Sequence, residues 1–302
     1  MQVSAAARRI RGHRLPSERV VASRPVTWRE QLGPVGVWRG GPAVDTALAA
    51  EIEGLGFGTI WIGGSPGSDL EHVEALIAAT TSVVLATGIV NIWRSDPAEL
   101  ARSFHRIEER HPGRLLLGVG TGHREATAER VRPLDAMQRY LDVLDQGGVP
   151  ASKRVISALG PKMLVIAAER SAGTHPYLTI PSQTAEQREA LGPDALVAPE
   201  QTVVLDPDPE QARASARAFL ANYLRMVNYT TTMRRGGFSE ADVADGGSDH
   251  LVDAIVRHGG PDEVADALRA HLDAGADHVC VQVQPAQDPL VAYRAIGERL
   301  GL

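Results

Sequence analysis

Residues 83–120 read VVLATGIVNIWRSDPAELARSFHRIEERHPGRLLLGVG and contain the signals of a strand, a helix and a second strand. Val83–Val90 is a continuous, mostly apolar run, which is typical of a strand buried on both faces. Asp96 is placed as an N-cap, Pro97 as the first helical residue and Glu99 as the partner in a capping box, so a helix should begin here. Leu115–Val119 is again a continuous apolar run. Two buried strands joined by a helix predict a parallel strand-helix-strand unit.

The same alternation continues in both directions along the chain. Val44, Leu48, Ile52 and Leu55 recur at helical spacing. Further helices are expected to begin at Pro133, Pro161, Ala185, Glu210 and Pro261. The remaining strands are expected at Val35–Trp38, Thr59–Ile62, Val155–Ala158, His175–Thr179, Val197–Leu205 and His278–Val283. Eight alternating units predict an α/β fold, a single (β/α)8 TIM barrel.

The domain organisation follows from where these patterns begin and where they are interrupted. Residues 1–30 show no apolar spacing that could pack, so we expect a disordered N-terminal extension followed by one barrel domain over residues 31–302. Residues 206–260, between the seventh and eighth strands, hold a long helix and then a Gly-rich, polar stretch. Insertions of this kind lie on the loop face of a barrel, so this one is expected to be helical and lid-like.

Composition limits the partners of the chain. Its net charge of -6 argues against nucleic acid, and no apolar run approaches the roughly 18 residues of a membrane span. Cys280 is the only cysteine, which excludes an intrachain disulfide and fits a cytoplasmic location. No pair of histidines has metal-ligand spacing, so we expect no metal. A small-molecule substrate is the expected partner, and a homodimer is left open.

Two glycine motifs are compatible at first sight with other chemistries. In GVGTGH, residues 118–123, the third glycine of a dinucleotide fingerprint would fall on His123, which excludes a Rossmann site. GGSPG, residues 63–67, matches a nucleophile elbow, but Ser65 is followed by Pro66, which has no N–H to donate to an oxyanion. The first motif is interpreted as a loop that joins a strand to a helix, and the second as a turn.

The active site of a barrel lies just past the carboxyl ends of its strands. In this chain that position is taken by Trp38 and Arg39 and by residues 63–65, 88–94, 121–124, 159–162, 179–182 and 282–284. Glycines, apolar and aromatic groups predominate there, which favours a flat conjugated ligand over sugar hydrolysis by paired carboxylates. We assign Trp38, Trp93 and Thr179 at these strand ends, together with Tyr177 of the predicted strand His175–Thr179, to the substrate pocket.

Four segments together resemble the luciferase-like monooxygenase superfamily. They are FGTIWIGG (57–64), LATGIVNIWRSDPAELARSFHRIEERHPGRLLLGVGTGHRE (85–125), RPLDAMQRYLDVLD (132–145) and AGTHPYLTIPSQTAEQREALG (172–192). The likeness is greatest to the actinobacterial branch that uses coenzyme F420, an 8-hydroxy-5-deazaflavin, and it extends over about residues 33–284. It implies a (β/α) barrel with a lid-like insertion.

The resemblance also implies where the coenzyme ring would lie. In relatives, a bulge with a non-proline cis peptide ends the third strand and backs the ring, and this device falls here at Gly88 and Ile89, with Asn91 nearby. The loop after the fourth strand lines the ring and the substrate space, which assigns Thr121 and Gly122 to the coenzyme.

Further residues are assigned through the same resemblance. Gly64 follows the second strand, where several relatives carry an acid and a histidine instead. The helix that begins near Gly160 and Pro161 resembles the family's phosphate site, and Lys162 would add positive charge to it. His123 stands where some relatives have a glutamate proton donor, so it is expected to be the catalytic proton-transfer group.

The function expected from the resemblance is hydride transfer between coenzyme F420 and a small organic substrate. One alternative is an FMN-dependent luciferase-like monooxygenase, because the superfamily uses both coenzymes. Another is a flavin- or deazaflavin-binding protein without turnover, which the missing histidine after the second strand keeps open. In that view no substrate would bleach the bound coenzyme.

Overall fold

The structure is a computed structural model that describes residues 27–122 and 132–302. Its strands are β1 (Val35–Gly40), β2 (Thr59–Gly63), β3 (Val84–Thr87), β4 (Val90–Asn91), β5 (Leu115–Gly120), β6 (Arg154–Ile156), β7 (Gly173–Thr174), β8 (Leu196–Val197), β9 (Glu200–Leu205), β10 (Val256–Gly259) and β11 (Val279–Gln284). Its helices are α1 (Trp28–Leu32), α2 (Thr46–Gly54), α3 (Glu71–Ala78), α4 (Pro97–Arg110), α5 (Pro133–Gln146), α6 (Pro161–Arg170), α7 (Pro181–Leu191), α8 (Pro209–Leu220), α9 (Val227–Arg235), α10 (Glu240–Val243), α11 (Asp249–Ile255), α12 (Pro261–Asp273) and α13 (Leu290–Leu300).

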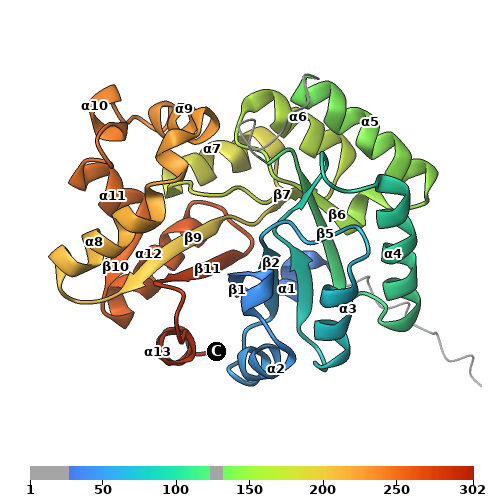
Figure 1. Ribbon diagram of the computed structural model, residues 1–302, viewed down its shortest axis with the longest axis horizontal. Helices are drawn as coiled ribbons and strands as arrows, with labels where there is room; N and C mark the ends of the chain where they lie inside the picture. The colour runs from blue at the N-terminus through green and yellow to red at the C-terminus, as the bar shows by residue number, and fades with distance from the viewer. Residues whose placement is uncertain (1–26, 123–131) are drawn as a thin grey trace, which may run out of the picture.

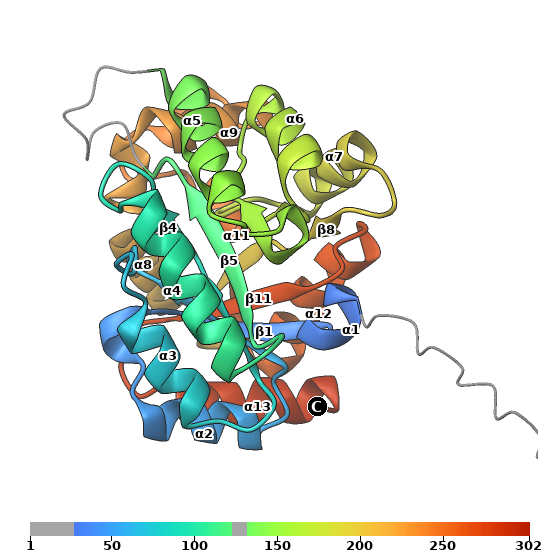
Figure 2. The same cartoon turned by 90° about the vertical axis from the view of Figure 1, so that its right-hand side faces the viewer.

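The strands form one parallel sheet that curves into a half-barrel, with helices on its outer side (Figures 1 and 2). The strand order is β10-β9-β11-β1-β2-β3-β5-β6-β7-β8, and β4 pairs with β5. The register brings the carboxyl ends of β1 and β2 together, since Gly40 pairs with Gly63. The expected α/β class and parallel sheet are therefore confirmed. No helix among the described residues is long and apolar enough to cross a membrane.

The N-cap and the proline that begin α4 act as the sequence predicts, whereas the Glu99 side chain accepts a hydrogen bond from the Ser68 hydroxyl instead of closing the expected capping box. Asp96 caps the helix, with its side chain accepting a hydrogen bond from the Glu99 amide at 2.7 Å, and Pro97 is the first helical residue. The face that carries Leu100 and Phe104 is buried against the sheet. The capping geometry and the buried stripe together explain why the chain turns into a helix here.

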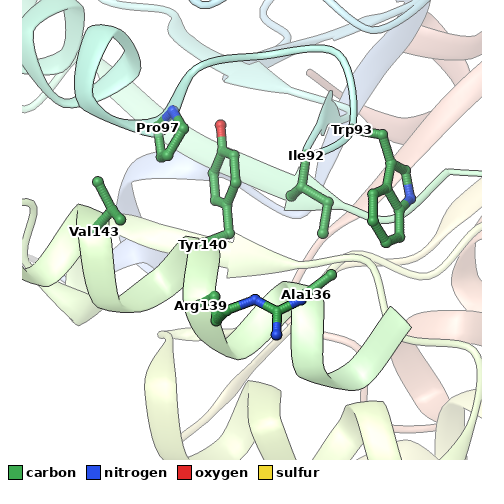
Figure 3. Close-up of a pocket in the computed structure, with 7 residues that line it drawn as sticks. All are labelled: Ile92, Trp93, Pro97, Ala136, Arg139, Tyr140 and Val143. Carbon is green, nitrogen blue, oxygen red and sulfur yellow. The ribbon is translucent and has the colours of Figure 1, made fainter. Parts of the chain in front are cut away.

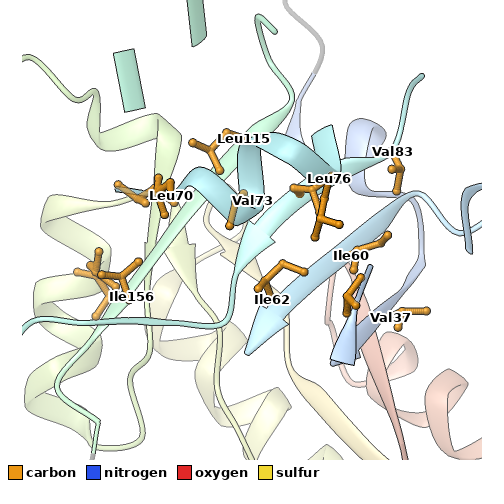
Figure 4. Packing of buried hydrophobic residues seen from close by; sticks show 14 of the residues in the cluster. Val37, Ile60, Ile62, Leu70, Val73, Leu76, Val83, Leu115 and Ile156 are labelled. Atoms are coloured by element: carbon orange, nitrogen blue, oxygen red, sulfur yellow. The ribbon is translucent and has the colours of Figure 1, made fainter. Parts of the chain in front are cut away.

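Apolar side chains fill both faces of the sheet. The largest cluster lies between the strands and the helices around them, and Figure 4 shows part of it, including Ile60 and Ile62 of β2 and Val73 and Leu76 of α3. A smaller cluster lines the inner face of the sheet, with Trp61 at its centre. Burial on both faces is the reason that these strands read as continuous apolar runs.

Three predicted strands are divided or displaced in the structure. The run Val197–Leu205 is divided into β8 and β9 by Ala198 and Pro199. The run Val83–Val90 is divided into β3 and β4 by a cis peptide bond between Gly88 and Ile89, at the position that the family resemblance implied. The prediction of a strand at His175–Thr179 is wrong. The strand at this point is β7, Gly173–Thr174, and residues 175–179 are irregular. Pro176 has no N–H for a ladder and Leu178 has a φ of 54°, so regular pairing ends there.

Helix bounds and the insertion also differ in detail from the prediction. The helix expected from Ala185 begins one turn earlier, at Pro181, and α3 and α13 have no counterpart among the predicted elements. Residues 206–260 are helical as expected and also contain β10, which pairs with β9. Helices α8–α11 gather on one side of the molecule around β9 and β10 (Figure 1). Helix α1 begins at Trp28, within the last residues of the extension expected at 1–30.

Candidate active site

The carboxyl ends of β1, β2 and β3 meet under the indole ring of Trp38. A Cβ atom added to Gly63 would lie 2.2 Å from Cζ2 of Trp38, and one added to Gly88 would lie 2.6 Å from its Nε1. These distances are far below van der Waals contact, so only glycine fits under the indole at both positions. We call Gly63 and Gly88 the glycine floor. Trp38 itself is half-buried, and Gly88 is partly exposed.

The loops after β4 and β5 lie against one another beside this floor. Trp93 donates a hydrogen bond from Nε1 to the Thr121 carbonyl oxygen at 2.8 Å, and its backbone N–H donates to Oδ1 of Asn91 at 2.9 Å. Gly122 has a φ of 55°, and a Cβ there would lie 2.5 Å from Nδ2 of Asn91. The structure thus brings together the residues assigned to the coenzyme ring. His123 lies outside the described residues.

A row of aromatic rings extends from Trp38 toward the insertion. The rings of Trp38 and Tyr177 are 5.2 Å apart between centroids, and Tyr177 in turn contacts Tyr223 and Tyr229 at 5.6 and 6.1 Å. The Tyr177 hydroxyl donates to Oε1 of Gln282 at 2.8 Å, and burial raises its pKa well above the usual value. Tyr177 is therefore a neutral, fixed wall of the site. Two of its aromatic neighbours, Tyr223 and Tyr229, come from residues 206–260, and the sequence patterns did not predict this contact.

Beneath Trp38 the inner face of the sheet carries two buried histidines. His175 stacks on Trp61 with 4.0 Å between ring centroids, and its Nδ1 donates to the Ala198 carbonyl oxygen at 2.8 Å. His278 accepts a hydrogen bond from Nε1 of Trp61 at 3.0 Å and donates from Nδ1 to the Gly33 carbonyl oxygen. Burial lowers the pKa of both histidines to about 4, so both are neutral near pH 7.

Glu200 is a buried acid on the same inner face. It is 0% exposed, and its carboxyl group lies beside the Thr202 hydroxyl and accepts from the Leu178 amide at 3.3 Å. Desolvation raises its pKa to about 8, so the protonated form predominates at pH 7. The sequence reading did not single out Glu200, although an acid inside an apolar run with Val203 and Val204 is a signal that could have identified it.

The amino end of α6 carries the residues assigned to a phosphate. Gly160 precedes the helix, Pro161 is its first residue, and Lys162 is exposed in the first turn. Arg235, at the end of α9, donates from Nη1 to the Leu159 carbonyl oxygen at 2.9 Å, which places a second cation next to this helix end. The sequence could not predict Arg235 because it lies 76 residues away along the chain.

Of two further assigned residues, Gly64 directly follows Gly63 in the chain and Thr179 lies just before α7. A Cβ on Gly64 would face the backbone of Gly41 at 3.7 Å, and Gly64 is exposed. Thr179 is buried just before α7, and its hydroxyl has no partner within the described chain.

Two cavities reach residues just past the strand ends, one at Ile92 and Trp93 and the other at Ile180–Ser182. One, of about 350 Å³, is formed by Ile92, Trp93 and Pro97 on one side and by Ala136, Arg139, Tyr140 and Val143 of α5 on the other (Figure 3). The other, of about 360 Å³, lies between α7 and α12. Neither contains a residue of the glycine floor, so we place the candidate site by its side-chain geometry. No group of acids, histidines and cysteines in residues 27–122 and 132–302 could hold a metal.

Known proteins resemble the chain in sequence. The family model of the luciferase-like monooxygenases matches residues 39–147 and 148–278. The chain is 26% identical over 206 residues to 5,10-methylenetetrahydromethanopterin reductase of Archaeoglobus fulgidus, covering 55% of this chain and 60% of that protein. It is 34% identical over 88 residues to an F420-dependent glucose-6-phosphate dehydrogenase of Mycobacterium avium, covering 26% of each. The chain thus spans less than two thirds of the length of either relative.

Solved structures share the fold at low sequence identity. An F420-dependent secondary alcohol dehydrogenase in complex with an F420-acetone adduct has a TM-score of 0.70 and 16% identity, covering 89% of this chain and 98% of that one. The oxygenating constituent of 3,6-diketocamphane monooxygenase of Pseudomonas putida, in complex with FMN, has a TM-score of 0.67 and 14% identity, with coverage of 88% and 97%. At such identities the likeness concerns the fold alone.

Proposed function

Because this chain belongs to the luciferase-like monooxygenase family, we propose that it is an oxidoreductase that binds coenzyme F420 and transfers hydride between it and a small organic substrate. F420-dependent proteins occur among its relatives in sequence and in structure, which supports F420 as the first choice. The observation on this chain that carries the proposal is the glycine floor between aromatic walls. A flat, side-chain-free surface at the ends of parallel strands suits a planar conjugated ring.

The residues at the site fit such a coenzyme at both of its ends. Nε1 of Trp38 and Nε2 of His175 are buried without a hydrogen-bond partner beside Gly88, so polar groups are available where a ring and its substrate would meet. At the other end, the amino terminus of the ten-residue helix α6, together with Lys162 and Arg235, offers positive charge to a phosphate.

When bound, the deazaflavin supplies the carbon that accepts or donates hydride. The chain's own residues would orient the reactants and exclude water. Trp38 and Tyr177 form apolar walls around the glycine floor, and the helices of residues 206–260 cover Tyr177 from outside. His123, directly after Gly122, is the proposed proton-transfer group, since a histidine titrates near neutrality and follows the loop that contacts Asn91.

We also infer that the half-barrel closes as a (β/α)8 barrel. β8 pairs with β7, β9 pairs with β11, and only Ala198 and Pro199 separate β8 from β9. Across this interruption the Ala198 amide donates to the Thr174 carbonyl oxygen, and the Cys280 amide donates to that of Pro199. In this interpretation β8 and β9 are one seventh strand, and residues 206–260 are an insertion before the eighth.

A binding titration with F420 and with FMN tests the proposal. The purified protein is expected to bind F420 more tightly than FMN, as followed by coenzyme absorbance and fluorescence. Tighter binding of FMN would favour the FMN-dependent monooxygenase, which the FMN-bound neighbour supports. Binding without bleaching by any of a broad substrate panel would favour a protein that carries the coenzyme without turnover. If neither coenzyme binds, the proposal is wrong.

Arg235→Ala tests the phosphate end of the site, and Arg234→Ala is its matched control. Arg235 reaches the α6 terminus, whereas the neighbouring Arg234 pairs with Glu240. An exposed cation contributes up to about 1 kcal/mol to such a contact, so Arg235→Ala should weaken F420 binding about three- to fivefold, and Arg234→Ala should leave it unchanged. Equal effects of the two variants would refute the assignment of Arg235.

A further inference from the structure

One cavity lies between the sheet and its outer helices and contains no residue of the glycine floor. It has a volume of about 350 Å³ and is enclosed by the loop that follows β4 and by helix α5 (Figure 3). Its lining consists of Ile92, Trp93, Pro97, Ala136, Arg139, Tyr140 and Val143. A volume of this size is at the lower end of the range for sites that bind small molecules.

The lining of this cavity is apolar and aromatic apart from one charge. Ile92 and Tyr140 are buried, at 8% and 5% exposed, and Ala136 and Val143 are half-buried. The Tyr140 hydroxyl is hydrogen-bonded to that of Ser95 at 2.8 Å, and burial raises the pKa of Tyr140 to about 12, so this hydroxyl is neutral and already paired. A ligand here would therefore meet mainly carbon surface, and no acidic residue lines the cavity.

Arg139 supplies the single charge of the cavity. It is exposed, and within residues 27–122 and 132–302 it has no ion-pair or hydrogen-bond partner. The acids around it are engaged elsewhere, because Asp142 pairs with Arg170 and Asp96, which lies near the Tyr140 hydroxyl, caps α4. Figure 3 shows the Arg139 side chain extended along α5 toward Ala136. Its guanidinium thus keeps its N–H donors free for an anion beside the apolar walls.

We propose that this cavity is a binding site for a small aromatic carboxylate. The ring of the ligand packs against Ile92, Trp93 and Val143. Its carboxylate accepts two parallel hydrogen bonds from Arg139, because the planar guanidinium matches the geometry of a carboxylate. The rings of Trp93 and Tyr140 favour an aromatic ligand over an aliphatic one, since aromatic pairs gain from offset or edge-to-face packing. A cationic ligand would be repelled by Arg139 and would find no acid in the lining to receive it.

Trp93 connects this cavity with the loops of the candidate active site. Its Nε1 donates to the Thr121 carbonyl oxygen at 2.8 Å, and its backbone N–H donates to Oδ1 of Asn91 at 2.9 Å. A ligand that packs on the Trp93 ring is therefore one hydrogen bond away from the loop assigned to the coenzyme, and the Trp93 indole N–H reports its presence. The inference concerns a second site and does not depend on which coenzyme the protein binds.

Titration of the purified full chain with naphthalene-2-carboxylate tests this site. In protein labelled with ¹⁵N-tryptophan, Trp93→Phe assigns the Trp93 indole signal, and Trp28, Trp38 and Trp61, which do not line the cavity, are internal controls. We expect a saturable shift of the Trp93 signal alone, with a dissociation constant on the order of 1 mM or below. The uncharged naphthalene-2-carboxamide has nearly the same shape and should bind about three- to fivefold more weakly, because it lacks the charge that Arg139 receives.

Three variants separate the charge from the shape of the cavity. Arg139→Gln should weaken binding of the carboxylate about three- to fivefold and remove its advantage over the carboxamide. Arg102→Gln is the matched control and should change neither, because Arg102 is an exposed arginine of α4 that does not line the cavity. Ala136→Leu adds apolar volume inside the cavity and should abolish the Trp93 shift. If Ala136→Leu does not fold, the comparison of carboxylate and carboxamide on the wild-type protein still decides.

Several outcomes would overturn the proposal. It is wrong if the Trp93 signal does not shift, if the carboxamide binds as tightly as the carboxylate, or if Trp38 shifts instead, which would place the ligand at the glycine floor. A Trp93 signal that changes with protein concentration but not with naphthalene-2-carboxylate would assign the cavity to a contact between copies of the chain. Failure of F420 and FMN to bind would overturn the proposed function alone.

Discussion

Replacing Gly63 by alanine would place a methyl group inside the Trp38 ring. The added Cβ would lie 2.2 Å from Cζ2 and 2.3 Å from Cη2, against an ordinary carbon contact of about 3.5 to 4.0 Å. The indole must then turn away, and its packing on Tyr177 is lost. Forcing an extra methyl group into a packed site costs about 1 to 3 kcal/mol, so Gly63→Ala should lower the free energy of unfolding by that amount.

Urea unfolding followed by circular dichroism measures this cost, and a double-mutant cycle identifies its cause. In a Trp38→Ala background the clash is absent, so Gly63→Ala should be close to neutral, with a coupling energy of about 1 to 3 kcal/mol. Gly54→Ala is the control, because a Cβ at this exposed end of α2 meets nothing within 4 Å, and it should be neutral or stabilising by up to about 1 kcal/mol. The reasoning fails if Gly63→Ala costs nothing, or if its cost is the same without the indole.

Three further predictions concern titratable groups. Burial lowers the pKa values of His175, His271 and His278 to about 4, so below pH 6.5 the unfolded chain binds protons more readily than the folded chain. As the pH falls from 6.5 to 4, each histidine should therefore lower the free energy of unfolding by up to about 1.4 kcal/mol per pH unit, which urea unfolding at a series of pH values measures. Glu200 acts in the opposite sense, because burial raises its pKa to about 8 and the folded protein loses stability as the pH rises from 4.5 to 8. Glu200→Gln should therefore stabilise the protein more at pH 8 than at pH 5. An equal effect at both pH values would contradict the burial argument. His123→Asn should keep F420 affinity within a few-fold and slow single-turnover hydride transfer at least about tenfold; an unchanged rate and pH profile would remove His123 from the mechanism.

The elements with strong local signals are those whose positions the sequence predicted well. Asp96 and Pro97 begin α4 because an N-cap and a proline at the first position act within a single turn. The prediction of a strand at His175–Thr179 was wrong because it rested on apolar character alone. Pro176 has no N–H to pair and Leu178 has a positive φ, and both interrupt a strand. β10 was missed for a related reason: Val256 follows α11 directly, and the segment is a strand because β9 pairs with it. Local chemistry thus decides where a helix begins, but pairing partners decide where a short strand lies.

The sequence by itself determined the class of this protein. The alternation of apolar runs with helical periods predicts parallel strands, and the block at residues 85–125 carries the family resemblance. It also indicated Gly88 and Ile89 as the irregular end of the third strand. These features are local because capping, periodicity and the absence of a side chain act over a few neighbouring residues.

Only the tertiary structure decided which side chains meet at the candidate site. Trp38 lies over Gly63 and Gly88, His175 turns Nε2 toward the same glycine, and Arg235 reaches the carbonyl oxygen of Leu159. Each of these contacts joins segments far apart in the chain. They depend on strand register and on the path of the chain between the strands, and a one-residue slip in a strand would turn its side chains to the opposite face. No pattern within one segment contains that information, because the distances are set by the sheet as a whole.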